Sequence, residues 1–155
     1  MRNVIAKSYQ LNTMILSDIL KDLNEHDTLN KTGQSNTIGW ILGHILASRG
    51  SMLSLLKTNY EKTENEEQYK RGSEKKDHIK IDPVKAMALF KERGKQIEEA
   101  LMHADESVLD EEIAYKLPGG GNQVKDAIQF SAWHETFHIG QIDLILAASG
   151  KGGIK

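Results

Sequence analysis

Two histidines four residues apart, His134 and His138, are the residues of this sequence best suited to chemistry. On a helix, side chains at this spacing lie one above the other on the same face. Residues at both ends of that face are apolar or small, as on a helix that packs into a core. The whole face comprises Ala127, Ser131, His134, His138, Gln141 or Ile142, and Ile145. An unpaired buried polar group costs about 1–3 kcal/mol. The two imidazoles therefore need a partner, and a divalent metal ion is one.

A third histidine, His44, lies in a segment that is apolar nearly all round, which predicts a deeply buried helix over residues 37–57. The residues expected on the same face of that helix are Thr37, Trp40, Ile41, Ala47, Ser48 and Ser51. Several of them are small and would leave room around the imidazole. His26, His78 and His103 lie among polar residues and are expected at the surface. The spacing leaves two interpretations open, a three-histidine metal site or core histidines with ordinary hydrogen bonds.

Two metal-enzyme motifs overlap the histidine pair, and the rest of the chain supports neither. Residues 134–138 spell H-E-x-x-H, in which two histidines bind zinc and the glutamate polarises water. The residues after His138 supply no histidine or glutamate as a third ligand, so Glu135 is only an outside candidate for a general base and is expected at the edge of the buried face. Residues 135–138 also spell Glu-x-x-His, but a di-iron bundle needs a second copy, and the chain has none.

The composition indicates one soluble, helical domain. A chain of 155 residues is long enough for a single core. The net charge of −2 gives no reason to expect nucleic acid or an anionic membrane as partner. No apolar run approaches the ~18 residues of a membrane span, and no signal peptide is evident. The absence of cysteine excludes disulfides and thiolate ligands and fits a cytoplasmic location.

Apolar periodicity predicts an all-α fold, a four-helix bundle with two long crossover connections. The expected helices span residues 2–24, 37–57, 83–103 and 124–149, with short helical turns near 61–69 and 105–109. Asp82 and Pro83 form a clear helix start, and Ser35 or Asn36 is the expected cap of the second helix. We expect one domain over residues 1–150, a frayed tail at 151–155, and a solvated connection at 58–81.

Two glycine patterns are interpreted structurally. Gly39 and Gly43 have the spacing of a close helix–helix contact. The run Gly119-Gly120-Gly121 precedes a helix, but no Gly-Lys-Ser/Thr follows it, so we expect a connection and not a phosphate-binding loop.

Taken together, Trp40-x-x-x-His44 and His134-x-x-x-His138-x-Gly140-Gln141 resemble the DinB/YfiT-like superfamily. The resemblance covers nearly the whole chain and implies a four-helix bundle, often a homodimer, in which His44, His134 and His138 bind a divalent metal. Many relatives carry arginine directly after the last histidine, where this chain has Ile139. The family includes transferases and isomerases that use bacillithiol or mycothiol, as well as hydrolases, and many members without an established activity.

The leading hypothesis is therefore a metal-dependent enzyme, a thiol-dependent transferase or a hydrolase, that acts on a small molecule. The ion would be zinc, nickel, iron or manganese, and a low-molecular-weight thiol is an expected cosubstrate. Gln141 and Glu135 are the candidate catalytic residues, and Trp40, Ser48, Ser131 and Gln141 are expected to line a cleft beside the ion. The alternatives are a non-catalytic metal-binding scaffold of a stress response and a metal-free helical dimer.

Overall fold

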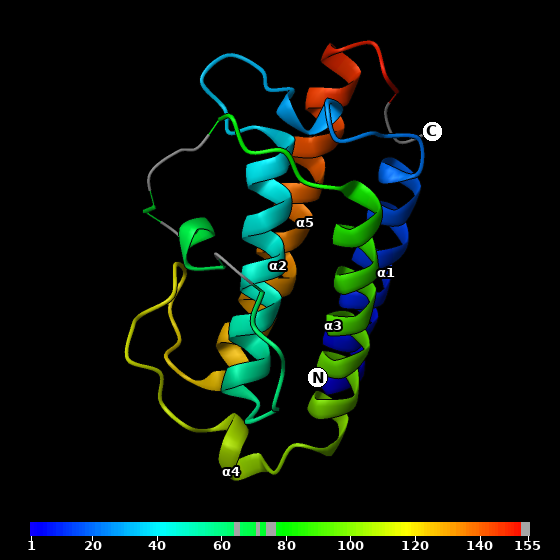
Figure 1. Ribbon diagram of the computed structural model, residues 1–155. Coiled ribbons are helices and arrows are strands. Elements are labelled where there is room, and N and C mark those ends of the chain that lie inside the picture. The colour runs from blue at the N-terminus through cyan, green and yellow to red at the C-terminus, as the bar shows by residue number, and fades with distance from the viewer. Residues whose placement is uncertain (64–65, 71, 74–76, 153–155) are drawn as a thin grey trace.

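The computed structural model describes residues 1–63, 66–70, 72–73 and 77–152. Its four long helices are α1 (Arg2–Leu20), α2 (Ile38–Leu55), α3 (Pro83–His103) and α5 (Val124–Ala148). Its short helical turns are η1 (Asp27–Leu29), η2 (Glu66–Tyr69) and α4 (Glu106–Leu109). The long helices lie side by side as a bundle (Figure 1), which confirms the predicted all-α four-helix architecture.

The order of the helices around the bundle is α1, α3, α2, α5, and each packs against the next. Helices α1 and α5 run in one direction and α2 and α3 in the other (Figure 1). The connection 56–82 joins opposite ends of the bundle, whereas 104–123 begins and ends at the same end and carries α4. Helices α2 and α3 are thus parallel neighbours, and α2 and α5 are antiparallel neighbours.

The helix starts follow from local hydrogen bonds. The Asp82 carboxylate accepts from the backbone N–H groups of Val84 and Lys85, and Pro83 occupies the first turn, as predicted. Helix α2 is capped by Thr37, whose hydroxyl accepts from the Trp40 N–H, so the expected cap at Ser35 or Asn36 was wrong.

Helix α1 ends at Leu20, four residues before the predicted end at residue 24. The Asn24 side-chain oxygen accepts from the backbone N–H groups of His26 and Asp27. This side chain therefore stabilises the turn into η1 in place of a further helical turn.

The core consists of two apolar clusters, one in each half of the bundle. One includes Ile45 and Ile142, and the other includes Leu53 and Ile128. Between them, at mid-height, lie buried polar and charged side chains: Asn12, Arg49, Arg93 and Glu135. We call these four residues the polar layer.

Gly39 and Gly43 of α2 allow close approach to connecting segments. A Cβ atom at Gly39 would lie 2.9 Å from the Ile79 carbonyl oxygen, and one at Gly43 would lie 2.5 Å from the Tyr69 ring. We expected these glycines to contact another helix of the bundle, and this expectation was wrong. Both neighbours, Ile79 and Tyr69, belong to the connection 56–82 and not to another long helix. The run Gly119-Gly120-Gly121 lies in the connection before α5, as expected, with φ values of 90°, 96° and 86°.

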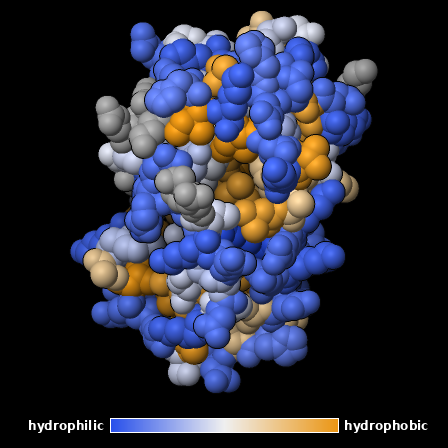
Figure 2. Space-filling model, viewed as in Figure 1, coloured by the Kyte–Doolittle hydropathy of each residue, from blue (hydrophilic) through white to orange (hydrophobic). Residues whose placement is uncertain are grey.

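Hydrophilic side chains cover most of the face shown in Figure 2, and hydrophobic side chains reach it as patches, mainly in its upper half. Among the helices that the structure describes, none combines the length and the apolar character needed to cross a membrane. Residues 153–155 of the predicted frayed tail lie outside the described residues. Before them, Lys151 forms an ion pair with the buried Asp27, at 2.7 Å.

Candidate metal centre

The structure brings together the three histidines that the sequence singled out. His44 projects from α2, and His134 and His138 project from α5. One nitrogen of each ring can be chosen so that all three lie within 4.8 Å of one another. Because α2 and α5 are antiparallel neighbours, positions 44 and 134–138 meet at the same height of the bundle. His26, His78 and His103 are exposed, as predicted.

The ring positions suit ligands that share one ion. The Nε2 atoms of His134 and His138 are 3.1 Å apart. Two imidazole nitrogens bound to one tetrahedral zinc lie about 3.3 Å apart, because each Zn–N bond is about 2.0–2.1 Å long. The His44 ring lies edge-on to both others, with centroids 5.2 Å from His134 and 4.9 Å from His138. This donor set of three imidazoles fits a divalent metal ion.

In two of the rings, a hydrogen bond at Nδ1 fixes the proton on that nitrogen and leaves the lone pair on Nε2, which faces the other histidines. His44 Nδ1 lies 2.7 Å from the Tyr69 carbonyl oxygen, which only accepts, so Nδ1 carries the proton. His138 Nδ1 donates to Oε1 of Gln141, also at 2.7 Å. In each ring the unprotonated nitrogen is therefore Nε2, which is available to bind a metal. Such outer partners fix the tautomer and orientation of ligating histidines.

The surroundings favour neutral imidazoles. Burial lowers the pKa of His44, against the opposing effect of its bond to the Tyr69 carbonyl. Burial, followed by the charges that His134 and His44 would carry, lowers the pKa of His138 to about 4, although the bond to Gln141 opposes this. His44 and His138 are 8% and 9% exposed. At neutral pH both rings are neutral, which is the form that binds metal.

Aromatic rings border the histidines. Trp40 stacks on His44 with centroids 5.0 Å apart, and Phe130 stacks on His134 at 5.7 Å. Phe137 meets His138 edge-on at 5.5 Å. These contacts restrict the rings of the site and surround it with apolar surface.

Of the four residues expected to line a cleft, two touch the histidines directly: Trp40 stacks on His44, and Gln141 bonds to His138. The other two bond to each other between α2 and α5, with Ser48 Oγ and Ser131 Oγ 3.1 Å apart. A cleft lined by these residues stays a prediction.

Glu135 occupies a different place from the one its motif suggests. It is 1% exposed, so its expected position at the edge of the buried face was wrong. Its two carboxylate oxygens accept from Arg49, from Nε at 2.7 Å and from Nη2 at 2.8 Å. This bidentate pair engages both oxygens, which argues against Glu135 as the general base of an H-E-x-x-H protease.

Sequence reasoning missed several residues around the site, among them Arg49 and Tyr69. Arg49 carried a signal, because it is the only charged residue in α2, a helix otherwise apolar nearly all round. A cation in such a helix predicts a buried counter-charge. Tyr69 carried none, because it acts through a backbone carbonyl on a connection.

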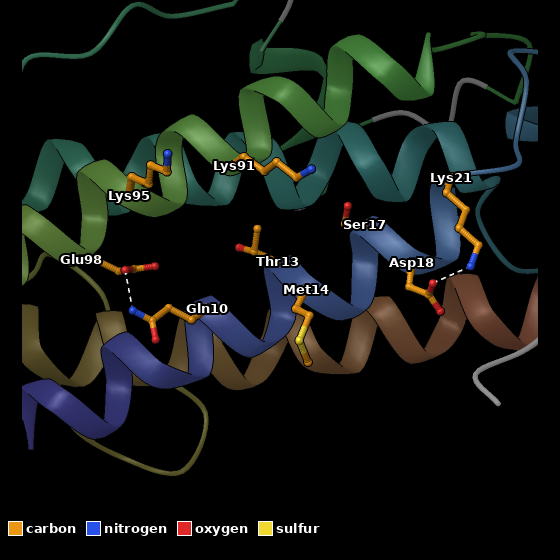
Figure 3. Close-up of a pocket in the computed structure, with 9 residues that line it drawn as sticks. All are labelled: Gln10, Thr13, Met14, Ser17, Asp18, Lys21, Lys91, Lys95 and Glu98. Atoms are coloured by element: carbon orange, nitrogen blue, oxygen red, sulfur yellow. Dashed lines mark hydrogen bonds and ion pairs between the residues drawn. The ribbon is translucent and has the colours of Figure 1, made fainter.

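A groove of about 740 Å³ lies between α1 and α3, on the side of the bundle opposite the α2–α5 interface. Figure 3 shows its lining: Gln10, Thr13, Met14, Ser17, Asp18, Lys21, Lys91, Lys95 and Glu98. Asp18 pairs with Lys21, and Glu98 accepts from Gln10. No histidine lines the groove, so it is separate from the candidate metal centre.

Comparison with known proteins supports the fold and the family. Residues 9–142 match the family model of the DinB superfamily. A crystal structure of a DinB-like protein from Bacillus cereus ATCC 10987 is similar in fold, with a TM-score of 0.68 and 16% sequence identity. The match covers 97% of this chain and 95% of that one. No curated protein sequence matches the chain. With a family match over most of its length and a bundle of the same fold, the chain belongs to the DinB superfamily.

Proposed function

We propose that this protein is a metal-dependent enzyme whose divalent ion is held by His44, His134 and His138. The observation that carries the proposal is the convergence of three ring nitrogens from two helices within 4.8 Å. The hydrogen bonds of His44 and His138 to outer acceptors support it, because they direct both Nε2 lone pairs toward the shared centre. An isolated core histidine needs no such convergence.

A divalent ion with three imidazole ligands and an open position lowers the pKa of a bound water or thiol, which supplies a nucleophile near neutral pH. The other residues of the chain hold the three histidine rings in position and shape the site around them. Tyr69 and Gln141 fix two of the rings, and Trp40 and Phe130 restrict them by stacking. Because the chain has no cysteine, a thiol nucleophile has to come from a low-molecular-weight cosubstrate.

The proposed reaction is a thiol-dependent transfer to, or a hydrolysis of, a small molecule. The aromatic border of the site supports a substrate with an apolar or aromatic part, because Phe130 and Phe137 lie directly against the histidine rings. Gln141 remains the candidate for a catalytic contact. Its Oε1 atom accepts from His138, and its amide NH₂ group is a potential donor to a substrate.

The test begins with metal binding. Untagged protein, stripped with a chelator, is titrated with Zn²⁺, Ni²⁺, Fe²⁺, Mn²⁺ and Co²⁺, with calorimetry and elemental analysis as measurements. We expect about one ion per chain for at least one metal. His138→Ala should weaken binding by more than about 100-fold, beyond the usual loss on removal of an outer partner. His103→Ala is the control, because His103 is exposed and bonds to a carbonyl of its own helix.

Loaded protein is then assayed with a panel of small thiols and electrophilic acceptors, and with ester and amide substrates for hydrolysis. Metal-dependent turnover that His138→Ala abolishes supports the enzyme. A wild-type protein that binds no ion, and whose stability a chelator leaves unchanged, contradicts the proposal and supports core histidines in a metal-free dimer.

A second candidate is a non-catalytic scaffold in which the ion ties α2 to α5. The low exposure of His44 and His138 favours it, because buried rings leave little room for a substrate to reach the ion. Metal would then raise the melting temperature, and His134→Ala would remove that increase, without turnover on any substrate of the panel.

The homodimer is also proposed. Its support is apolar surface on the outer face of α5, where Trp133 and Phe137 are mostly exposed and stack on each other with centroids 6.1 Å apart. Leu144 extends this face. Light scattering after size exclusion should give twice the chain mass for the wild type, and Trp133→Ser with Phe137→Ser should shift it toward the monomer. A monomeric wild type contradicts this part of the proposal.

A further inference from the structure

Two buried arginines of the polar layer each connect to a different part of the histidine site. One connects to the segment of α5 that carries His134 and His138, and the other connects to the turn behind His44. Arg49 in α2 and Arg93 in α3 are 0% and 1% exposed, and each pairs with a buried glutamate. Each arginine is followed by a glycine, Gly50 and Gly94. The two Arg-Gly pairs lie on neighbouring helices, and each glycine makes room for the ion pair of the other arginine.

The first pair, Arg49 with Glu135, connects all four long helices. Besides its bidentate bond to Glu135 in α5, the Arg49 guanidinium donates to Thr13 Oγ1 in α1 at 3.0 Å and to the Phe90 carbonyl in α3. Glu135 follows His134 directly and precedes His138 by three residues. The rotation of α5 that places Glu135 against Arg49 is therefore the rotation that presents both histidines toward α2.

The second pair, Arg93 with Glu66, reaches His44 through η2. Arg93 Nη1 donates to Glu66 Oε1 at 2.6 Å and to the Leu46 carbonyl at 2.7 Å. Glu66 begins η2, and Tyr69 ends it. Arg93 thus anchors the short turn whose last carbonyl accepts from His44 Nδ1.

The glycines fit these pairs closely. A Cβ atom at Gly94 would lie 2.5 Å from Arg49 Nη1, and one at Gly50 would lie 2.5 Å from Glu66 Oε1. Alanine at position 94 would therefore push against Arg49 Nη1, which bonds to the Phe90 carbonyl. Alanine at position 50 would push against Glu66 Oε1, which accepts from Arg93, and against the Tyr60 ring. By contrast, a Cβ atom at Gly140, an exposed glycine of α5 close to the histidines, would meet nothing within 4 Å.

Stability alone is a weak reason for such pairs, because buried ion pairs are often replaceable by well-packed apolar residues without loss of stability. We propose that both pairs are positioning elements of the three-histidine site: Arg49–Glu135 orients His134 and His138, and Arg93–Glu66 holds the Tyr69 carbonyl behind His44. This inference rests on the metal binding proposed above, and it assigns a role to residues outside the ligand set.

The first test separates positioning from stability. The double variant Arg49→Met with Glu135→Leu removes both charges and keeps apolar volume, and its melting temperature should stay close to that of the wild type. Its affinity for Co²⁺ should nevertheless fall by at least about tenfold, as after the loss of outer-shell support. The visible spectrum of bound Co²⁺ should also change, because ligand geometry sets its bands.

The second test needs only one added methyl group. Gly50→Ala should displace Glu66, weaken Co²⁺ binding by about tenfold and alter the Co²⁺ spectrum through His44, whereas Gly140→Ala should leave both unchanged. If the double variant does not fold, Gly94→Ala tests the Arg49–Glu135 pair in the same way, because its added Cβ atom would lie 2.5 Å from Arg49 Nη1. If Gly50→Ala protein binds Co²⁺ with wild-type affinity and spectrum, the role assigned to Arg93–Glu66 is overturned. If the folded double variant does so, the role assigned to Arg49–Glu135 is overturned. If the wild type itself binds no ion, the proposed function fails and this inference fails with it.

Discussion

His44 Nδ1 lies 2.7 Å from the carbonyl oxygen of Tyr69, a residue 25 positions further along the chain. This bond links the buried helix α2 to the connection 56–82, the charge-rich segment of the sequence. Gly43 makes the contact possible, because any larger residue there would meet the Tyr69 ring. The connection is therefore part of the surroundings of the histidine site and more than a solvated loop.

Gly43→Ala should destabilise the fold. The new Cβ atom would lie 2.5 Å from the Tyr69 ring, and overpacking of this kind costs about 1–3 kcal/mol. Urea denaturation of the metal-free protein measures the change. Gly140→Ala is the matched control, since the added methyl meets nothing and should stabilise α5 by up to about 1 kcal/mol. Equal stability of Gly43→Ala and the wild type would show that Tyr69 does not pack as described.

Gln141→Ala should weaken metal binding without removing a ligand. The substitution takes away the acceptor of the His138 Nδ1–H group, and loss of such a partner costs about 10–100-fold in metal affinity. Calorimetric titration gives the Kd. Gln10→Ala is the control, because Gln10 bonds to Glu98 across the groove on the opposite side of the bundle. An unchanged Kd in Gln141→Ala would remove Gln141 from the support of the site.

The rotation of α5 is tested by one buried and one exposed residue two positions apart. Ile142 is fully buried, so Ile142→Ala should lower the free energy of unfolding by about 2–5 kcal/mol. Leu144 is exposed in the single chain, so Leu144→Ala should change the free energy of unfolding of the monomer by no more than about 0.5 kcal/mol, measured at a protein concentration at which no dimer forms. Chemical denaturation compares the two. A larger loss of stability for Leu144→Ala than for Ile142→Ala would mean that α5 presents a different face to the core. His134 and His138 would then not point toward His44 as described.

The ion pair of Lys151 with Asp27 should make stability depend on pH. The bond to Lys151, followed by the N–H of Asn24, lowers the pKa of Asp27 below its ordinary 3.8 in the folded state. Its contribution is thus present above pH 3.8 and is lost as the pH falls through the lower folded value. Lys151→Ala should cost less than about 1 kcal/mol at pH 7, and the difference from the wild type should shrink below pH 3.8.

Denaturation curves at pH 7, 5 and 3 provide this measurement, with Lys151→Arg as the control that keeps the cation. A difference between Lys151→Ala and the wild type that does not change with pH would mean that the substitution acts through something other than the Asp27 carboxylate.

Apolar periodicity and capping residues were enough to predict the four long helices, because local spacing and end signals report directly on helix formation. The limits of α3 at Pro83 and His103 were predicted, as was the start of α5 at Val124. The end of α1 was missed, since it depends on a side-chain bond of Asn24 that competes with the helix. Histidine spacing on α5 placed two of the three site residues on one face.

The sequence by itself determined which residues are able to bind a metal and which helices carry them, because residue type and helical period are local properties. Tertiary structure decided that position 44 meets positions 134 and 138, that Tyr69 orients one of the rings, and that Glu135 belongs to Arg49. The physical reason is that each of these contacts joins segments 25 to 94 residues apart. Such contacts depend on the order and direction of helices in the bundle, which no short-range pattern specifies.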